Sequence, residues 1–171
     1  NSMLIGITGT TSGIGKALLD MPYEFETFDR ADGDIENPEA VYNKLFFCDV
    51  FINNAWYNDC QTALLKYFFN KWKNKTKKII SIGSSVSSYQ PTGSGYHDYV
   101  DYKRNLRKAH CDIVNLKTST CKSYLVNPGV TDTKMTASQN RKKMTTSDVV
   151  GILRFVLEHN LYIPEIYFNV E

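Results

Sequence analysis

The sequence predicts a single α/β domain, a three-layer α/β/α fold with a doubly wound parallel sheet. Short apolar runs alternate with longer amphipathic runs along the chain, as expected for strands joined by crossover helices. A glycine-rich turn at residues 9–15 follows the first apolar run. The 171 residues are about one domain's worth and contain no visible repeat or linker. We therefore expect one domain spanning residues 1–171.

The first half of the chain predicts three strands and three helices. The apolar run at 3–8 is the first strand, and the glycine turn opens a helix that stops at residue 19, before Pro22. Apolar and polar residues alternate at 23–29, which predicts the second strand. Pro38 suits the first turn of a helix over 38–46, and 49–53 is the third strand. Apolar residues at helical spacing place a long helix at 59–73.

The second half continues this alternation. Residues 78–82 and 122–126 predict buried strands, and the first of them leads through a serine- and glycine-rich loop to a helix at 96–115. Pro128 and Gly129 end the strand at 122–126. We expect a last helix at 145–160, with Ser147 as its candidate cap, and a last strand at 165–170.

Composition argues against several classes of protein. With 20 Lys and Arg against 18 Asp and Glu, the net charge of +2 gives no global reason to expect binding to nucleic acid or to a membrane. No apolar run reaches the roughly 18 residues of a transmembrane helix. Four cysteines without CxxC spacing predict neither a metal site nor a disulfide framework. We expect a cytoplasmic protein that starts naturally at Met3, with Asn1 and Ser2 left over from cloning.

The glycine-rich turn is the strongest chemical signal. It reads Thr8-Gly9-Thr10-Thr11-Ser12-Gly13-Ile14-Gly15 and lies between a predicted strand and a predicted helix. Free backbone N–H groups at a helix start, with glycines that admit a pyrophosphate, form the anion cradle of Rossmann-like folds. A Walker A loop does not fit, because Thr10 and Ala17 stand where that motif needs glycine and Ser or Thr. The alternative is a tight turn without a ligand.

Asp29 ends the second predicted strand. An acidic residue about 20 positions after the glycine turn binds the adenosine ribose hydroxyls and favours NAD, because it repels a 2′-phosphate. Arg30 could instead accept the extra phosphate of NADP, so both cofactors stay open. Asp29 and Arg30 could also form a solvated strand end.

Tyr99 and Lys103 lie four residues apart, on one face of a predicted helix. A cation beside a phenol favours the phenolate, which makes tyrosine a usable acid or base near neutral pH. Tyr67 and Lys71 share this spacing. Only Tyr99, however, follows a strand that runs into Gly83-Ser84-Ser85 at the carboxyl edge, where α/β sheets hold their sites. We therefore interpret Tyr67 and Lys71 as packing and surface residues.

In their order and spacing these segments resemble the short-chain dehydrogenase/reductase family over nearly the whole chain. The family's glycine signature matches residues 8–15. Its Asn-Asn-Ala-Gly motif matches Asn53, Asn54 and Ala55, with Trp56 in place of glycine, and its Ser, Tyr and Lys match Ser85, Tyr99 and Lys103. The first half also resembles the nucleotide-sugar enzyme dTDP-4-dehydrorhamnose reductase, which would place Asp34 and Ile35 against the adenine.

The resemblance implies NAD(P)-dependent hydride transfer between nicotinamide and a small carbonyl or alcohol substrate. Ser85 would hold the carbonyl oxygen, Tyr99 would pass the proton, and Lys103 would lower the tyrosine pKa and grip the nicotinamide ribose. Asn58 would be the fourth catalytic residue, holding a water. The implied cofactor-binding residues are Gly9, Thr11, Ser12, Gly13, Ile14, Gly15, Asp29, Arg30, Asp34, Ile35, Asn53, Asn54, Ala55, Lys103, Pro128, Gly129, Thr131 and Thr133.

The chain also departs from the family. Little sequence lies between Asp29 and Asp34, so we expect the sheet to lack a full third strand. Trp56 narrows the nicotinamide pocket, and only residues 134–144 remain to cover a substrate. A dinucleotide-binding sensor without catalysis and a nucleotide-sugar-modifying enzyme therefore remain alternatives. Because family members often pair, and 59–73 carries much aromatic surface, we expect a homodimer or homotetramer built on helices 59–73 and 96–115.

Overall fold

The computed structural model describes residues 3–87 and 97–171. Within these residues, six strands form one sheet in the order β2-β1-β3-β4-β5-β6, and every neighbouring pair is parallel. The strands are β1 (Leu4–Thr8), β2 (Glu24–Phe28), β3 (Val50–Asn53), β4 (Lys78–Ile82), β5 (Lys122–Pro128) and β6 (Glu165–Phe168). The predicted loop between β4 and the following helix, including Gly95 and Tyr96, lies largely outside the described residues.

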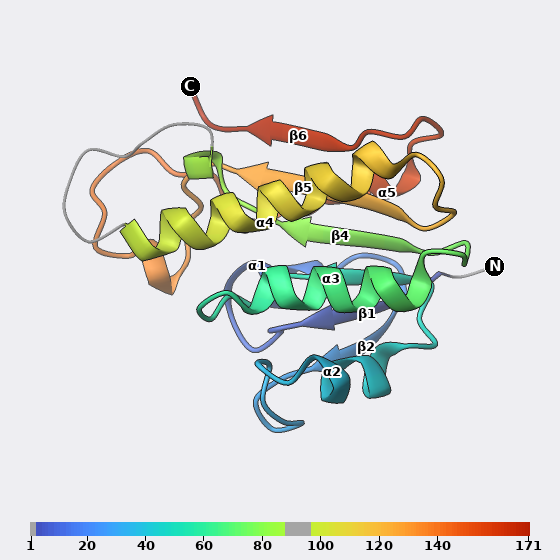
Figure 1. Cartoon of the computed structure of the whole chain (residues 1–171). Helices are drawn as coiled ribbons and strands as arrows, with labels where there is room; N and C mark the ends of the chain where they lie inside the picture. Colours follow the sequence, from blue (N-terminus) through green and yellow to red (C-terminus); the bar gives the residue numbers. More distant parts are fainter. Residues whose placement is uncertain (1–2, 88–96) are drawn as a thin grey trace.

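Helices cover both faces of the sheet, which confirms the predicted three-layer architecture (Figure 1). One core lies between the sheet and the helices α2, α3 and α4, and the second lies between the sheet and the helices α1 and α5. The helices are α1 (Gly13–Leu18), α2 (Pro38–Leu45), α3 (Cys60–Trp72), α4 (His97–Leu116) and α5 (Thr146–Glu158), with short 3₁₀ turns η1 (Ser85–Ser87) and η2 (Lys134–Thr136). None of the helices in the described part of the chain has the length and apolar character needed to cross a bilayer.

The central strands are apolar on both sides because both of their faces are covered. Phe51 of β3 stacks on Phe68 of α3 with ring centroids 3.9 Å apart. Its neighbour Ile52 points to the opposite face and joins the core beneath α1 and α5. This two-sided burial fixes the register of the strands, and with it the positions of the polar residues that follow them.

The order of the strands places a switch point between β1 and β3. The chain leaves β1 through α1 to reach β2 on one side, then returns through α2 to β3 on the other side. Open α/β sheets bind ligands outside the carboxyl ends of the strands at such a point. Larger dinucleotide folds carry a further strand outside β2. In the described residues β2 is the edge of the sheet, as the short spacing between Asp29 and Asp34 predicts.

The predicted elements agree with the observed ones within one or two residues, but the predicted cap of the last helix is wrong. Thr145 caps α5: its hydroxyl accepts from the Asp148 amide at 3.1 Å, and the Asp148 carboxylate accepts from the Thr145 amide at 2.9 Å. This reciprocal pair is a capping box. Ser147 lies inside the first turn, where its side chain cannot cap.

The aromatic side chains of α3 are used inside the chain. Tyr42 of α2 contacts Tyr67, Phe68 and Trp72 of α3 with ring centroids 5.2 to 6.5 Å apart, and both Phe68 and Trp72 are fully buried. The expected excess of aromatic surface on this helix is therefore absent from the described structure, because α2 covers it. The aromatic side chains of α3 therefore do not themselves favour a homo-oligomer.

Candidate functional site

The glycine turn after β1 has the backbone geometry of a phosphate cradle. Gly9 and Gly13 adopt φ of 75° and 59°, a left-handed region that side chains disfavour. A Cβ on Gly15 would lie 1.8 Å from the Gly9 carbonyl oxygen, so glycine is required there. At Gly13, by contrast, the nearest atom to an added Cβ would be Thr133 Cγ2 at 3.6 Å. The turn is therefore open at Gly13, beside the first-turn amides of α1, which have no acceptor within the helix.

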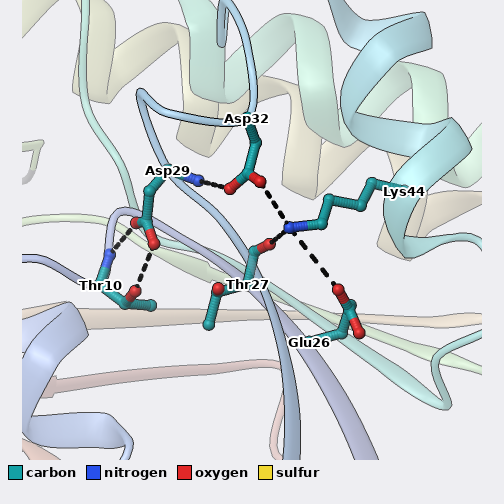
Figure 2. Close-up of polar contacts among 6 residues, drawn as sticks. All are labelled: Thr10, Glu26, Thr27, Asp29, Asp32 and Lys44. Carbon is teal, nitrogen blue, oxygen red and sulfur yellow. Dashed lines mark hydrogen bonds and ion pairs between the residues drawn. The ribbon is translucent and has the colours of Figure 1, made fainter.

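Asp29 ties the end of β2 to this turn (Figure 2). Its carboxylate accepts hydrogen bonds from the Thr10 amide at 2.6 Å and from the Thr10 hydroxyl at 2.7 Å. Each carboxylate oxygen has a second lone pair, so these bonds leave capacity for a ribose hydroxyl. Asp29 is thus both a structural anchor of the turn and the predicted contact for the ribose.

A second set of charges fixes the segment after β2 (Figure 2). The Asp29 amide donates to Asp32 at 2.8 Å, and Asp32 accepts from Lys44 of α2, also at 2.8 Å. The hydrogen bond from Lys44 lowers the pKa of Asp32. Lys44 also pairs with Glu26 at 3.6 Å. Lys44 is thus paired with two carboxylates, and Arg30, the residue after Asp29, is exposed.

The two asparagines after β3 have different surroundings. Asn54 donates through its side chain to the carbonyls of Thr8 and Gly9, both at 3.1 Å, and so holds the glycine turn. Asn53 is fully buried, and its side chain donates to the Gln61 carbonyl at 2.8 Å. Successive strand residues point to opposite faces, which explains why only Asn54 reaches the turn. The Asn53 side chain is therefore turned toward α3, and contact between Asn53 and a cofactor stays a prediction.

The predicted adenine-binding residues lie between β2 and α2. Asp34 is exposed, and its carboxylate accepts from the Glu36 amide at 2.9 Å. Ile35 is half-buried and packs on the core beneath α2 and α3. Ile35 thus leaves only part of its side chain for a flat ligand.

The loop after β5 meets the site through Thr133, which lies beside Gly13. Thr131 is buried, and its hydroxyl donates to the Gly129 carbonyl at 3.1 Å. A Cβ on Gly129 would lie 2.2 Å from Asn169, so this glycine makes room for the segment after β6. A bridge between Thr131 and Met144 closes the segment at 132–143, which includes most of the predicted substrate cover.

Ser84 and Ser85 follow the carboxyl end of β4, on the side of Tyr99 in α4. Burial raises the pKa of Tyr99, and Ser84 opposes that rise. Both serines are buried, and Ser85 begins η1. Ser84 is held in turn by its amide, which donates to Asn127 of β5 at 3.2 Å. Trp56 packs edge-on against the Tyr99 ring at 5.1 Å.

Lys103 is buried, with 4% of its surface exposed. Its ammonium donates to the side-chain oxygen of Gln61 at 2.7 Å and to the Ile82 carbonyl at 3.0 Å. Burial lowers the pKa of Lys103 to about 7. The nitrogen lies 5.5 Å from the Tyr99 ring centroid. Burial shifts the Tyr99 pKa in the direction opposite to the lowering expected from Lys103.

The predicted fourth catalytic residue does not join this cluster. Asn58 is exposed and has a φ of 48° in the turn before α3. Gln61, which sequence reasoning missed, contacts Lys103 instead. The available signal was its place in the first turn of a helix directly after a buried strand, where a polar residue faces the strand ends.

Solved short-chain dehydrogenases share this fold. A short-chain dehydrogenase from Burkholderia cenocepacia J2315 in complex with NADP matches with a TM-score of 0.81 and 16% identity, over 99% of this chain and 89% of that one. An alcohol dehydrogenase from Thermococcus sibiricus with 5-hydroxy-NADP matches with a TM-score of 0.77 and 16% identity, over 99% and 97%. The 3-alpha-hydroxysteroid dehydrogenase of Pseudomonas sp. B-0831 with NADH matches with a TM-score of 0.72 and 14% identity, over 96% and 94%.

No protein-family model and no curated protein sequence matches the chain. At identities of 14 to 16% the structural matches define its fold, which is that of Rossmann-like short-chain dehydrogenases. The resemblance of the first half to dTDP-4-dehydrorhamnose reductase rests on the sequence alone.

Proposed function

We propose that this protein is an NAD(P)-dependent oxidoreductase that transfers a hydride between nicotinamide and a small carbonyl or alcohol substrate. The observation that carries the proposal is the place of Lys103 at the carboxyl end of β4, where it donates to the Ile82 carbonyl and lies 5.5 Å from the Tyr99 ring centroid. Ser84 and Ser85 follow the same strand end and are buried. This cluster and the glycine turn lie at the same edge of the sheet as the switch point between β1 and β3, where ligands of this fold class bind.

The turn fits a dinucleotide. The open approach at Gly13 and the first-turn amides of α1 would hold the pyrophosphate, and Asp29 would bind the adenosine ribose. Thr133, on the far side of Gly13, would contact the cofactor from the loop after β5. A bound nicotinamide supplies or accepts the hydride.

The chain's own residues move the proton. Ser85 donates a hydrogen bond to the carbonyl oxygen of the substrate, and Tyr99 Oη gives its proton to that oxygen in the direction of reduction. Lys103, whose pKa lies near 7, is balanced between its two protonation states at neutral pH. That balance suits a group that replaces the proton lost by Tyr99.

NAD is the preferred cofactor in this proposal. A 2′-phosphate near Asp29 would meet a carboxylate, and the nearby Lys44 is already paired with Asp32 and Glu26. Arg30 is the counterweight, because an exposed guanidinium can pair with a phosphate. A calorimetric titration with NADH and with NADPH decides between them, and tighter binding of NADPH would reverse the preference.

A second candidate is a dinucleotide-binding sensor or interaction protein that performs no chemistry. The packing of Trp56 against Tyr99 favours it, because that side chain stands beside the proton donor. A panel of carbonyl and alcohol substrates separates the two proposals. Binding of NADH without turnover of any substrate would support the sensor.

The decisive variant is Tyr99→Phe, which keeps the ring packed on Trp56 but removes the hydroxyl. Loss of a single proton-transfer group costs about 10² to 10⁴ in rate, so turnover should fall by that factor while NADH still binds. Tyr67→Phe is the matched control, because Tyr67 has the same spacing to a lysine but packs on Tyr42 of α2. Equal turnover in wild type and Tyr99→Phe would refute the mechanism.

A further inference from the structure

We propose that Gln61 is a positioning residue that holds Lys103 at the carboxyl end of β4. The inference rests on the proposed function for its catalytic meaning. The contact itself belongs to the free protein and can be tested there.

Gln61, Lys103 and the Ile82 carbonyl form a closed triangle of hydrogen bonds. Lys103 donates to Gln61 Oε1 at 2.7 Å and to the Ile82 oxygen at 3.0 Å, and Gln61 Nε2 donates to the same oxygen at 2.9 Å. Ile82 is the last residue of β4, two positions before Ser84. Lys103 is thereby attached to the strand end that Ser84 and Ser85 follow.

The orientation of the Gln61 amide is set by its other partners. Its Nε2 also donates to the Asn53 carbonyl at 2.9 Å, while the Asn53 side chain donates to the Gln61 carbonyl at 2.8 Å. Because two carbonyl oxygens surround Nε2, a flipped amide would place oxygen against oxygen. Gln61 Oε1 is therefore obliged to face Lys103.

A neutral acceptor has a specific consequence for Lys103. An ammonium has three N–H donors, and Gln61 and Ile82 take two of them. Among the described residues the third has no hydrogen-bond acceptor, and the Tyr99 ring centroid lies 5.5 Å from the nitrogen. A carboxylate in place of the amide would stabilise the ammonium much more strongly, so an amide can hold Lys103 in place and still let it titrate near neutral pH.

The experiment measures the pKa of Lys103 in the free protein by NMR of ¹³C-labelled lysine side chains. The resonance is assigned by its loss in Lys103→Met. Gln61→Glu should raise this pKa by about one to three through the added charge. Gln61→Met should lower it by about one to two, because the ammonium loses a hydrogen-bonded acceptor. Opposite shifts from two substitutions at one position are not produced by general loosening of the fold.

Two further variants complete the comparison. Thr62→Val is the matched control: Thr62 is the next residue of α3, is buried, and has a hydroxyl without a hydrogen-bond partner, so the pKa of Lys103 should not change. Asn58→Gly tests whether Asn58, the predicted fourth catalytic residue, influences Lys103. Glycine tolerates the positive φ at position 58. Should Gln61→Met fail to fold, Gln61→Asn, which keeps an amide on a shorter side chain, is expected to lower the pKa as well.

The outcomes separate this inference from the proposed function. An unchanged Lys103 pKa in Gln61→Glu, or a shift caused by Asn58→Gly instead, would overturn the positioning role. Expected NMR shifts in a protein that binds no NADH and turns over no substrate would leave the contact intact and reject the oxidoreductase. With an active enzyme, the pH–rate limb governed by Lys103 should move in the same direction as the NMR pKa in each Gln61 variant, and turnover of Gln61→Met should fall about 10²-fold.

Discussion

Replacement of Lys103 by methionine should stabilise the protein at neutral pH while it abolishes activity. Lys103 is 4% exposed, and its side-chain partners in the described structure, Gln61 and Ile82, are neutral oxygens. Burying an ammonium without a carboxylate partner costs free energy, because the charged group loses its hydration. Methionine has a similar length and no charge, so the variant removes this cost and keeps most of the packing.

The magnitude follows from the pKa of Lys103. Burial moves it from an ordinary 10.5 to about 7, and each pKa unit corresponds to about 1.4 kcal/mol. The charged form therefore costs the folded state about 4 to 5 kcal/mol at or below pH 7. Methionine leaves Gln61 Oε1 without its donor, while the Ile82 oxygen keeps its bond from Gln61 Nε2; the lost bonds cost about 1 to 3 kcal/mol. The net gain of about 2 kcal/mol corresponds to a Tm higher by about 4 to 8 °C for a chain of this size.

The pH dependence identifies the cause. Between pH 7 and 10.5 the unfolded chain keeps the Lys103 proton and the folded protein has released it, so wild-type stability rises with pH in this window. The stability of Lys103→Met lacks this rise with pH. The stability difference between the variant and the wild type should therefore shrink by about 2 kcal/mol from pH 7 to pH 9. Thermal unfolding followed by circular dichroism at both pH values measures it, and other titrating groups cancel in the difference. A Tm difference that is equal at pH 7 and pH 9 would refute the reasoning.

Three further predictions test the glycine turn, the ribose contact and a buried histidine. Gly15→Ala places a Cβ 1.8 Å from the Gly9 oxygen and should lower the stability by about 1 to 3 kcal/mol. It should also abolish NADH binding measured by calorimetry, and unchanged binding would show that the phosphate cradle is misassigned. Asp29→Ala should lower the affinity for NADH more than the affinity for NADPH. The variant loses the bonds to Thr10 with either cofactor, but for NADPH it also removes the charge that repels the 2′-phosphate. An unchanged ratio of the two affinities would contradict this prediction. Burial lowers the pKa of His110 to about 4, so wild-type stability should fall by about 3 kcal/mol as the pH drops from 6.5 to 4, a loss that urea titrations of His110→Gln should lack.

The fold could be predicted because its signals are local. The apolar runs are long enough to define each strand, and Pro22 and Pro38 mark where helices end and begin. The missing edge strand was visible as a short distance between Asp29 and Asp34. The cap of α5 was missed because three neighbouring residues, Thr145 to Ser147, can all accept from a backbone amide, and only the reciprocal bond with Asp148 selects Thr145.

The sequence predicts which segments form the candidate site, but it does not predict the contacts between their side chains. Spacing along a helix places Tyr99 and Lys103 on one side, but it does not say which atoms surround them. Whether Lys103 lowers the pKa of Tyr99 depends on the balance of burial and charge, and burial dominates here. Spacing likewise does not distinguish Ser84 from Ser85, because both follow Gly83 and only the path of the turn decides which of them faces α4.

The short connection between β3 and α3 explains why glutamine holds Lys103. Only six residues separate Asn53 from Cys60, the ends of these two elements, so the first turn of α3 lies directly beside the strand ends. Gln61 is then buried between β3 and β4 and reaches the Asn53 and Ile82 carbonyls. Asn58 falls in the turn itself, where a φ of 48° carries it into solvent. A longer connection would move the start of the helix away from the strand ends, and a residue one or more turns further along α3 would then face Lys103. The short connection therefore explains why Gln61, and not Asn58, contacts Lys103.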